Sequence, residues 1–204
     1  MSVIYGKYKQ TLNDIANELS TRLEIHNNNI YDKTGYKLFE HISSRVKSEE
    51  SMIEKCERKG VPANYESALG LMRDAIGIRI VSTFIDDIQT NIDYIKNMPD
   101  VTVVKEKDYI KHAKPNGYRS YHLILDVEWD EEDFRGNTPG HYFVEVQLRT
   151  IAMDSWAALE HQLKYKKDVP NHELIESELK RVADEINSCD LSMKTIRNLI
   201  RGSI

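Results

Sequence analysis

The sequence predicts an α/β (α+β) fold in which helices flank one mixed β-sheet. Several short segments alternate apolar and polar residues, which is typical of half-buried strands. Between them, and at both ends of the chain, apolar residues recur every three or four positions, as in amphipathic helices. No stretch rich in Pro, Gly or Ser divides the 204 residues. We therefore expect one domain, with its core at about residues 36–167 and helical extensions at 1–30 and 170–204.

The first predicted helix carries its apolar residues at helical spacing, so they share one face. We expect this helix to end at the asparagine run 27–29, because Asn favours turns. The apolar residues of this face are Tyr8, Leu12, Ile15, Leu19 and Leu23.

A predicted strand at residues 42–48 leads into a helix that runs to about residue 59. The strand alternates apolar and polar residues. Ser48 is a favourable N-cap for the helix, and Gly60 is a favourable residue at its end.

Helices and strands then alternate through the middle of the chain. The segments that follow are expected to be helix 65–72, strand 75–84, helix 86–97, strand 101–105, a basic loop at 111–117, strands 119–127 and 141–149, and helix 151–165.

A long final helix begins after Pro170 and carries a heptad seam of apolar residues. We expect this seam to dock either on the N-terminal helix of the same chain or on another subunit. The seam consists of Ile175, Leu179, Val182, Ile186, Cys189, Met193, Ile196 and Ile200.

The composition excludes several classes of protein. Apolar residues make up 40% of the chain and charged residues 30%, as in ordinary soluble proteins. No apolar run is long enough to span a membrane, and the N-terminus lacks the apolar core of a signal peptide. The two cysteines, Cys56 and Cys189, do not form a zinc or redox motif, so we expect a reducing, cytoplasmic environment.

Basic residues are concentrated although the net charge is −5. Residues 103–122 contain five Lys or Arg against two acidic residues. Such local clustering in an acidic chain suits a small polyanion, such as a nucleotide triphosphate, better than a DNA groove.

A polar strand face is the most informative feature. The predicted strand 141–149 presents Glu145, Gln147 and Arg149 on one side. The strand before it places His122 in the same polar register, so the two strands together predict the floor of a polar cleft.

Asp74 directly precedes the apolar strand, and sheet pairing could bring it close to Glu145. Two carboxylates together with substrate phosphates are sufficient ligands for Mg²⁺. The alternative is a junction residue that pairs with Arg73 or Arg79.

Cationic side chains follow the strand at 42–48 and continue along one face of the next helix. Arg and Lys in such a wall would bind phosphate groups. The alternative is a solvated face in which nearby glutamates form surface ion pairs. The wall consists of Arg45, Lys47, Ser51, Lys55, Arg58 and Lys59.

Tyr118 follows a Pro-Asn-Gly turn and is flanked by basic residues, so its ring could stack on a purine. The alternative is an ordinary half-buried tyrosine. Neither GxxxxGK[ST] nor GxGxxG occurs, which excludes a P-loop kinase and a Rossmann dinucleotide site.

Four sequence blocks resemble, in order, the synthetase domain of the RelA/SpoT superfamily: RVKSEESMIEKCERKG, RDAIGIRI, KDYIKHAKPNGYRSYHL and VEVQLRTIAMDSWAALEHQLKYK. They extend over about residues 40–167. Because no hydrolase or regulatory domain accompanies them, the chain resembles a small alarmone synthetase of the RelQ/RelP type. The resemblance implies a nucleotidyltransferase-like fold and a homotetramer assembled through the terminal helices.

Members of this family transfer pyrophosphate from ATP to the 3′-hydroxyl of GDP or GTP, giving ppGpp or pppGpp and AMP. The resemblance implies that Asp74 and Glu145 hold Mg²⁺ and that Glu145 also helps to activate the hydroxyl. The residues implied for ATP are Arg45, Lys47, Ser51, Lys55, Arg58, Lys59 and Arg79. Those implied for GDP or GTP are Lys107, Lys114, Asn116, Tyr118, His122, Gln147 and Arg149.

Two other functions stay open on the residues alone. One is a nucleotide- or RNA-binding sensor with weak catalysis, which the intact Asp74 and Glu145 disfavour. The other is a nucleotidyltransferase that releases pyrophosphate instead of AMP.

The net charge of −5 gives no support to single-stranded RNA binding. Residues 41–44 do not repeat the family's pattern for activation by (p)ppGpp, so that property also stays open.

Overall fold

The computed structural model describes residues 4–164 and 171–202, whose strands form one mixed sheet. The strand order is β1-β2-β5-β4-β3, and only the central pair β2 and β5 is parallel. This confirms the predicted fold class. The strands are β1 (His41–Val46), β2 (Ile76–Ser82), β3 (Val101–Asp108), β4 (Tyr121–Trp129) and β5 (Gly140–Thr150).

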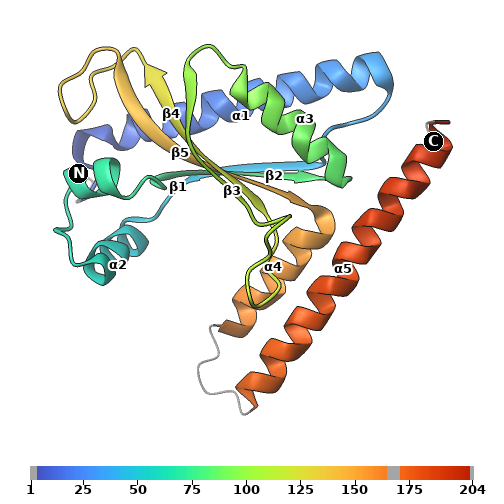
Figure 1. The fold of residues 1–204 in the computed structure, drawn as a ribbon. Coiled ribbons are helices and arrows are strands. Elements are labelled where there is room, and N and C mark those ends of the chain that lie inside the picture. The colour runs from blue at the N-terminus through green and yellow to red at the C-terminus, as the bar shows by residue number, and fades with distance from the viewer. Residues whose placement is uncertain (1–3, 165–170, 203–204) are drawn as a thin grey trace.

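Helices lie on both sides of this sheet. Figure 1 shows α1 and α3 on one side, and α4 and α5 packed against each other beyond the end of β5. No helix among the described residues is long and apolar enough to cross a membrane. The helices are α1 (Lys9–Thr34), α2 (Glu49–Lys59), α3 (Ile85–Lys96), α4 (Ile151–Lys164) and α5 (His172–Ile200), with short turns η1 (Gly6–Tyr8) and η2 (Ser67–Leu71).

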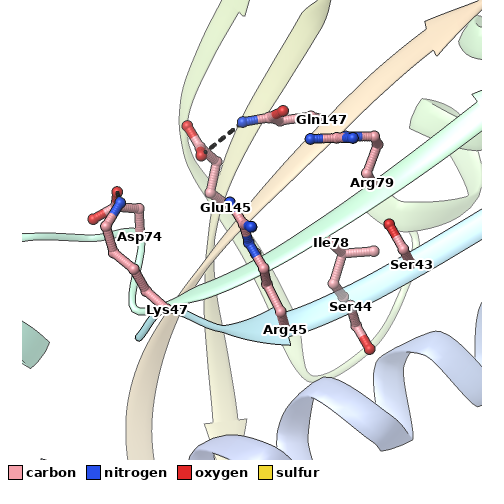
Figure 2. Close-up of a pocket in the computed structure, with 10 residues that line it drawn as sticks. Ser43, Ser44, Arg45, Lys47, Asp74, Ile78, Arg79, Glu145 and Gln147 are labelled. Atoms are coloured by element: carbon pink, nitrogen blue, oxygen red, sulfur yellow. Dashed lines mark hydrogen bonds and ion pairs between the residues drawn. The ribbon is translucent and has the colours of Figure 1, made fainter. Parts of the chain in front are cut away.

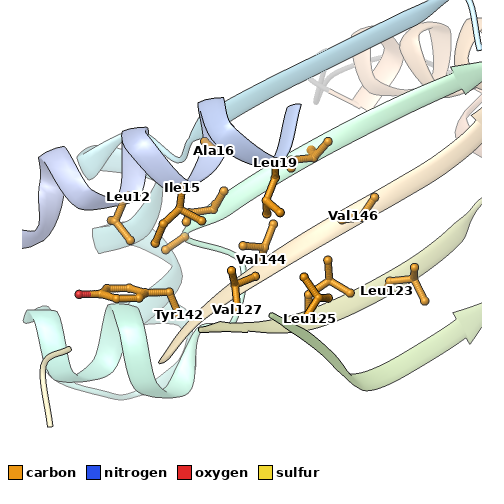
Figure 3. Close-up of a cluster of buried hydrophobic side chains, with 14 of the residues drawn as sticks. Leu12, Ile15, Ala16, Leu19, Leu123, Leu125, Val127, Tyr142, Val144 and Val146 are labelled. Atoms are coloured by element: carbon orange, nitrogen blue, oxygen red, sulfur yellow. The ribbon is translucent and has the colours of Figure 1, made fainter. Parts of the chain in front are cut away.

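The two faces of β5 differ as its alternating sequence predicts. Glu145 and Gln147 project into a polar cleft (Figure 2). The alternate side chains are buried beneath α1 (Figure 3) and belong to the main core. Each buried aliphatic or aromatic side chain contributes about 1.5–3 kcal/mol relative to an exposed one. The core therefore fixes β5 and, with it, the direction of the polar side chains. The buried residues of β5 are Tyr142, Val144, Val146 and Leu148.

The predicted end of the first helix at residues 27–29 is wrong. Helix α1 continues to Thr34 and ends at Gly35, whose φ is +73°. Asn27 is buried, and its side-chain amide donates to the backbone oxygen of Phe39 at 3.0 Å. Its amide oxygen accepts from the backbone N–H of Leu38 at 2.7 Å. Asn27 thus bonds to the chain that follows the helix, which removes the competition that usually ends helices at Asn.

Two further boundaries differ from the sequence prediction. The helix expected at 65–72 is mainly a π-helical turn, Ser67–Leu71. Strand β3 extends to Asp108, three residues beyond the predicted end, because its antiparallel pairing with β4 continues past a bulge near Val103. This extension places Lys107 directly opposite His122.

Helix α5 packs on α4 and α3 and not along α1, so docking on the N-terminal helix of the same chain is wrong. Val182 and Ile186 of the heptad seam contact the small core around Trp156. Towards its C-terminal end the seam is exposed, with Met193 at 48% and Ile196 at 50% of their full exposure.

Candidate active site

Two adjoining cavities lie along the polar face of the sheet, and the carboxylates of Asp74 and Glu145 line both. The first cavity, of about 150 Å³, is lined by Ser43, Ser44, Arg45, Lys47, Asp74, Gly77, Ile78, Arg79, Glu145 and Gln147 (Figure 2). The second, of about 440 Å³, is lined by Lys55, Lys59, Leu71, Met72, Arg73, Asp74, Lys105, Lys107, His122, Ile124 and Glu145.

Sheet pairing explains why the two carboxylates converge. In the parallel ladder between β2 and β5, Glu145 lies opposite Gly77. Asp74 stands just before β2, where the backbone N–H of Lys47 donates to the carbonyl oxygen of Ala75 at 2.8 Å. Both acidic residues therefore lie near the start of β2, in the only pair of strands that is parallel among the described residues.

Asp74 pairs with lysines and not with Arg73 or Arg79, so the junction pairing considered from the sequence is wrong. Its Oδ2 lies 2.6 Å from the Nζ of Lys55 and 3.2 Å from that of Lys47. Its Oδ1 is buried and has no hydrogen-bond partner among the described residues. A buried carboxylate oxygen without a partner is unfavourable, so this atom is suited to accept a cation.

Glu145 is half-buried, and each of its oxygens lies close to a polar side chain. Oε2 accepts from the side-chain amide of Gln147 at 3.0 Å, and Oε1 lies 3.5 Å from the Nδ1 of His122. Burial raises the pKa of Glu145. Interactions with His122 and Gln147 and the charge of Lys55 together lower it by more than burial raises it, so the pKa lies below the ordinary value. The carboxylate is therefore ionised at neutral pH.

The predicted cationic wall is divided between the two cavities. Arg45 on β1 and Lys47, which directly follows β1, line the first cavity, together with Arg79 on β2. Lys55 and Lys59 on α2 line the second cavity. The exposed residues Ser51 and Arg58, also on α2, line neither cavity.

The residues predicted for GDP or GTP are also divided. Gln147 lines the first cavity, whereas Lys107 and His122 line the second. The structure thus mixes the two predicted nucleotide sets within each cavity, and the individual roles stay predictions.

The remaining predicted acceptor residues form a cluster beside the cavities. The ammonium group of Lys114 lies 4.6 Å from the ring centroid of Tyr118. Asn116 donates from its side chain to Glu160 on α4 at 3.1 Å, which ties the basic loop to that helix. Arg149 is buried beneath Tyr118 and donates to its hydroxyl at 2.7 Å.

Several residues of the site are absent from the sequence prediction. Arg73 lines the second cavity, and its guanidinium lies 4.7 Å from the ring centroid of Phe143. Lys105 lines the same cavity and belongs to the basic segment 103–122, which could have identified it. Trp156 packs against Tyr118 with 6.3 Å between the ring centroids, a contact between distant segments that no local pattern signals.

No group of three or more His, Cys, Asp or Glu side chains in residues 4–164 and 171–202 could hold a metal ion. Protein side chains alone therefore do not form a closed metal site there. The carboxylates of Asp74 and Glu145, which line both cavities, are acidic side chains that could contribute ligands to an ion.

Comparison with known proteins agrees with this geometry. The family model described as "Region found in RelA / SpoT proteins" matches residues 44–169. The GTP pyrophosphokinase YwaC of Bacillus subtilis is 40% identical over 165 residues, which cover 80% of this chain and 76% of YwaC. GTP pyrophosphokinase YjbM of the same organism is 36% identical over 162 residues, covering 79% and 74% of the two chains.

Solved structures are similar over nearly the whole chain. Small alarmone synthetase 1 from Bacillus subtilis, bound to its product pppGpp, superposes with a TM-score of 0.80 at 32% identity, covering 93% of this chain and 94% of that one. Small alarmone synthetase 2 from the same organism gives a TM-score of 0.79 at 36% identity, with 93% and 95% covered.

Proposed function

The chain belongs to the RelA/SpoT family, and we propose that it is a small alarmone synthetase, a GTP pyrophosphokinase that makes (p)ppGpp. In this reaction the β- and γ-phosphates of ATP move to the 3′-hydroxyl of GDP or GTP, and AMP leaves. One observation carries the proposal: Asp74 and Glu145 line two adjoining cavities that both contain cationic side chains. Two nucleotides can therefore meet at one acidic centre.

Glu145 is the candidate general base. The attacking 3′-hydroxyl must lose a proton as it bonds to the β-phosphorus of ATP. The carboxylate of Glu145 is ionised at neutral pH, so it has the free oxygen lone pairs needed to accept that proton. The hydrogen bond from Gln147 and the nearby imidazole of His122 also hold the carboxylate in a defined orientation, which favours in-line attack.

ATP fits the first cavity in this proposal. Arg45 and Arg79 are planar cations that can stack on adenine or bind phosphate through two parallel hydrogen bonds. Lys47 lies beside Asp74, where the transferred phosphates must pass. Lys55 contacts the same carboxylate from the second cavity, so it can reach those phosphates from the opposite side.

GDP or GTP fits the second cavity and the neighbouring cluster. Lys107 would neutralise the acceptor phosphates, and His122 would help to position the acceptor beside Glu145. Lys59, which the resemblance implies for ATP, lines the same cavity and could reach phosphates of either nucleotide. The half-buried ring of Tyr118 is the candidate platform for guanine, with Lys114 beside it.

Mg²⁺ fits the acidic centre. The unpartnered buried Oδ1 of Asp74 and the ionised carboxylate of Glu145 are oxygen ligands of the kind that Mg²⁺ prefers. Asp74 and Glu145 would hold the ion together with phosphate oxygens. When bound, Mg²⁺ neutralises charge on the phosphates during transfer.

We also propose a homotetramer assembled through the terminal helices. The exposed apolar side chains on the C-terminal half of α5 support this, because apolar groups exposed together on one helix favour a protein contact. They are Leu191, Met193, Ile196, Leu199 and Ile200.

Product analysis tests the proposed reaction. The protein is incubated with ATP, Mg²⁺ and either GDP or GTP, and the nucleotides are separated by ion-exchange chromatography. The expected products are AMP with ppGpp or pppGpp, and neither forms when the acceptor is omitted. Release of pyrophosphate would indicate a nucleotidyltransferase, and nucleotide binding without turnover would indicate a sensor. Either result would overturn the proposal.

A further inference from the structure

Arg149 is a cation that lines neither cavity. It lies near the end of β5 with only 6% of its surface exposed, and it donates four hydrogen bonds within the protein. Nη1 donates to Asp154 at 2.9 Å, and Nε donates to the hydroxyl of Ser120 at 3.4 Å. Because most of its donors are used and Asp154 balances its charge, Arg149 is poorly placed to bind a substrate phosphate directly.

The other guanidinium nitrogen begins two chains of polar contacts that both end on Glu145. In the first chain, Nη2 donates to the Oε1 of Gln147 at 3.0 Å, and the amide nitrogen of Gln147 donates to the Oε2 of Glu145 at 3.0 Å. In the second, Nη2 donates to the hydroxyl of Tyr118 at 2.7 Å, which lies 2.9 Å from the Nε2 of His122. The Nδ1 of His122 is 3.5 Å from the Oε1 of Glu145.

The direction of the second chain follows from the chemistry of its first member. An arginine can only donate, so the oxygen of Tyr118 accepts from Arg149 and its single hydrogen is free to bond to the Nε2 of His122. The imidazole then carries its hydrogen on Nδ1, the nitrogen that faces Glu145. The first chain therefore ends in a hydrogen bond to one oxygen of the carboxylate, and the second ends with an N–H group that faces the other oxygen at 3.5 Å.

We propose that Arg149 is a positioning residue which, through these two chains, holds the carboxylate of Glu145 in place and links it to the guanine platform Tyr118. The inference rests on the proposed function, because Glu145 is the general base only in that reaction. It differs from the acceptor-binding role that the family resemblance implies for Arg149. Small displacements of a base relative to its substrate lower the rate strongly, so the effect belongs to kcat rather than to substrate affinity.

Tyr118→Phe is the decisive variant, because it removes the hydroxyl and keeps the ring that would stack on guanine. We expect kcat to fall about tenfold while KM for GDP and for ATP stays within about twofold of the wild type. Tyr142→Phe is the matched control, since it removes another hydrogen-bonded hydroxyl, to the carbonyl oxygen of Glu132, on the opposite face of the sheet. Its kcat should equal that of the wild type.

Arg149→Met interrupts both chains, and we expect it to lower kcat by about a hundredfold. Adding Tyr118→Phe to Arg149→Met should not lower kcat any further, because Arg149→Met has already interrupted the second chain. Thermal unfolding of each variant separates loss of rate from loss of fold. An unchanged kcat for Tyr118→Phe, or multiplicative losses in the double variant, would overturn the proposal.

A spectroscopic measurement tests the direction of the chain without turnover. Histidine ¹⁵N resonances, with His122 assigned by its loss in His122→Gln, should show the Nδ1–H form in the wild type and a shift towards the Nε2–H form in Tyr118→Phe. A wild-type Nε2–H form would overturn the inference. If the wild-type protein makes no AMP or (p)ppGpp, the proposed function itself fails, which is a different outcome from an active enzyme that tolerates Tyr118→Phe.

Discussion

The ammonium group of Lys55 on α2 lies 2.6 Å from the Oδ2 of Asp74, which precedes β2. This contact brings a helix, a strand and the acidic centre together, and it leaves Oδ1 of the same carboxylate buried without a partner. Lys47, which directly follows β1, also approaches Oδ2. Two cations thus approach one oxygen of Asp74, while the other oxygen is buried without a hydrogen-bond partner among the described residues.

The first prediction concerns the two carboxylates. Glu145→Gln and Asp74→Asn keep the size of each side chain and remove its charge, so each should lower (p)ppGpp synthesis by more than about a hundredfold and leave the fold intact. Product formation and circular dichroism measure the two effects. Asp126→Asn, at a polar position on β4 that lines neither cavity, is the control. Retention of more than a tenth of the rate by either carboxylate variant would contradict their assignment.

The second prediction concerns Tyr118. Tyr118→Ala removes the proposed guanine platform, and stacking of a base on an aromatic ring contributes about 1–3 kcal/mol. We expect the Kd for GDP to rise by roughly tenfold or more, with the Kd for ATP nearly unchanged, as measured by titration calorimetry. An equal loss of affinity for GDP and ATP would contradict a specific contact between Tyr118 and guanine.

The third prediction concerns the contact between the basic loop and α5. Gly117 has a φ of +90°, and a Cβ there would lie 2.5 Å from the Cβ of Ala183. Gly117→Ala must therefore displace the loop that carries Tyr118, which should raise KM for GDP several-fold and lower the melting temperature. Gly136→Ala is the control, because its φ is +83° but no atom lies within 4 Å of the added Cβ. Backbone strain should lower the free energy of unfolding of Gly136→Ala by about 1–2 kcal/mol, and its kcat and KM should equal those of the wild type.

The sequence predicted most of the sheet because its strands alternate strongly. The alternation in β5 fixed which side chains are buried, and this placed Glu145 and Gln147 on the polar face. The prediction from sequence failed where tertiary contacts outweigh local preference. Asn27 lies within a helix because its side chain bonds to residues beyond the helix end.

The site was predicted less completely than the sheet. Motif blocks identified the charged residues, but they could not divide them between two cavities, because that division depends on how α2 lies against the sheet. The role that we propose for Arg149 was equally hidden, since its partners Tyr118 and Asp154 come from different segments. Burial and hydrogen-bond direction are properties of the folded chain.

The fourth prediction concerns stability at acid pH. Arg22 on α1 donates two hydrogen bonds to Asp100, at 2.6 and 2.8 Å, and these hold the pKa of Asp100 below its usual value, although partial burial opposes the effect. The pair therefore stabilises the fold above the unfolded pKa of about 3.9, and this contribution is lost as the pH falls through the lower folded pKa.

Asp100→Asn should accordingly lower the free energy of unfolding at neutral pH and have little effect once the pH lies below the folded pKa of Asp100, as measured by urea unfolding at several pH values. Glu18→Gln removes the other, more exposed partner of Arg22 and should have a smaller effect. A loss for Asp100→Asn that is the same at every pH would show that packing, and not ionisation, is responsible.

The last prediction concerns the exposed face of α5. Ile196 is half exposed and follows Met193 by three positions, so the two side chains share a helix face that the described chain leaves uncovered. If this face is a subunit contact, Ile196→Asp places a charge in an apolar interface, which is strongly unfavourable without a partner.

Multi-angle light scattering should show a tetramer for the wild type and a smaller species for the variant. Thr195→Asp, on an exposed neighbouring position, should keep the wild-type mass. Because Ile196 lies outside the cores of the single chain, circular dichroism of Ile196→Asp should match the wild type. An unchanged mass for Ile196→Asp would exclude this face of α5 from the assembly.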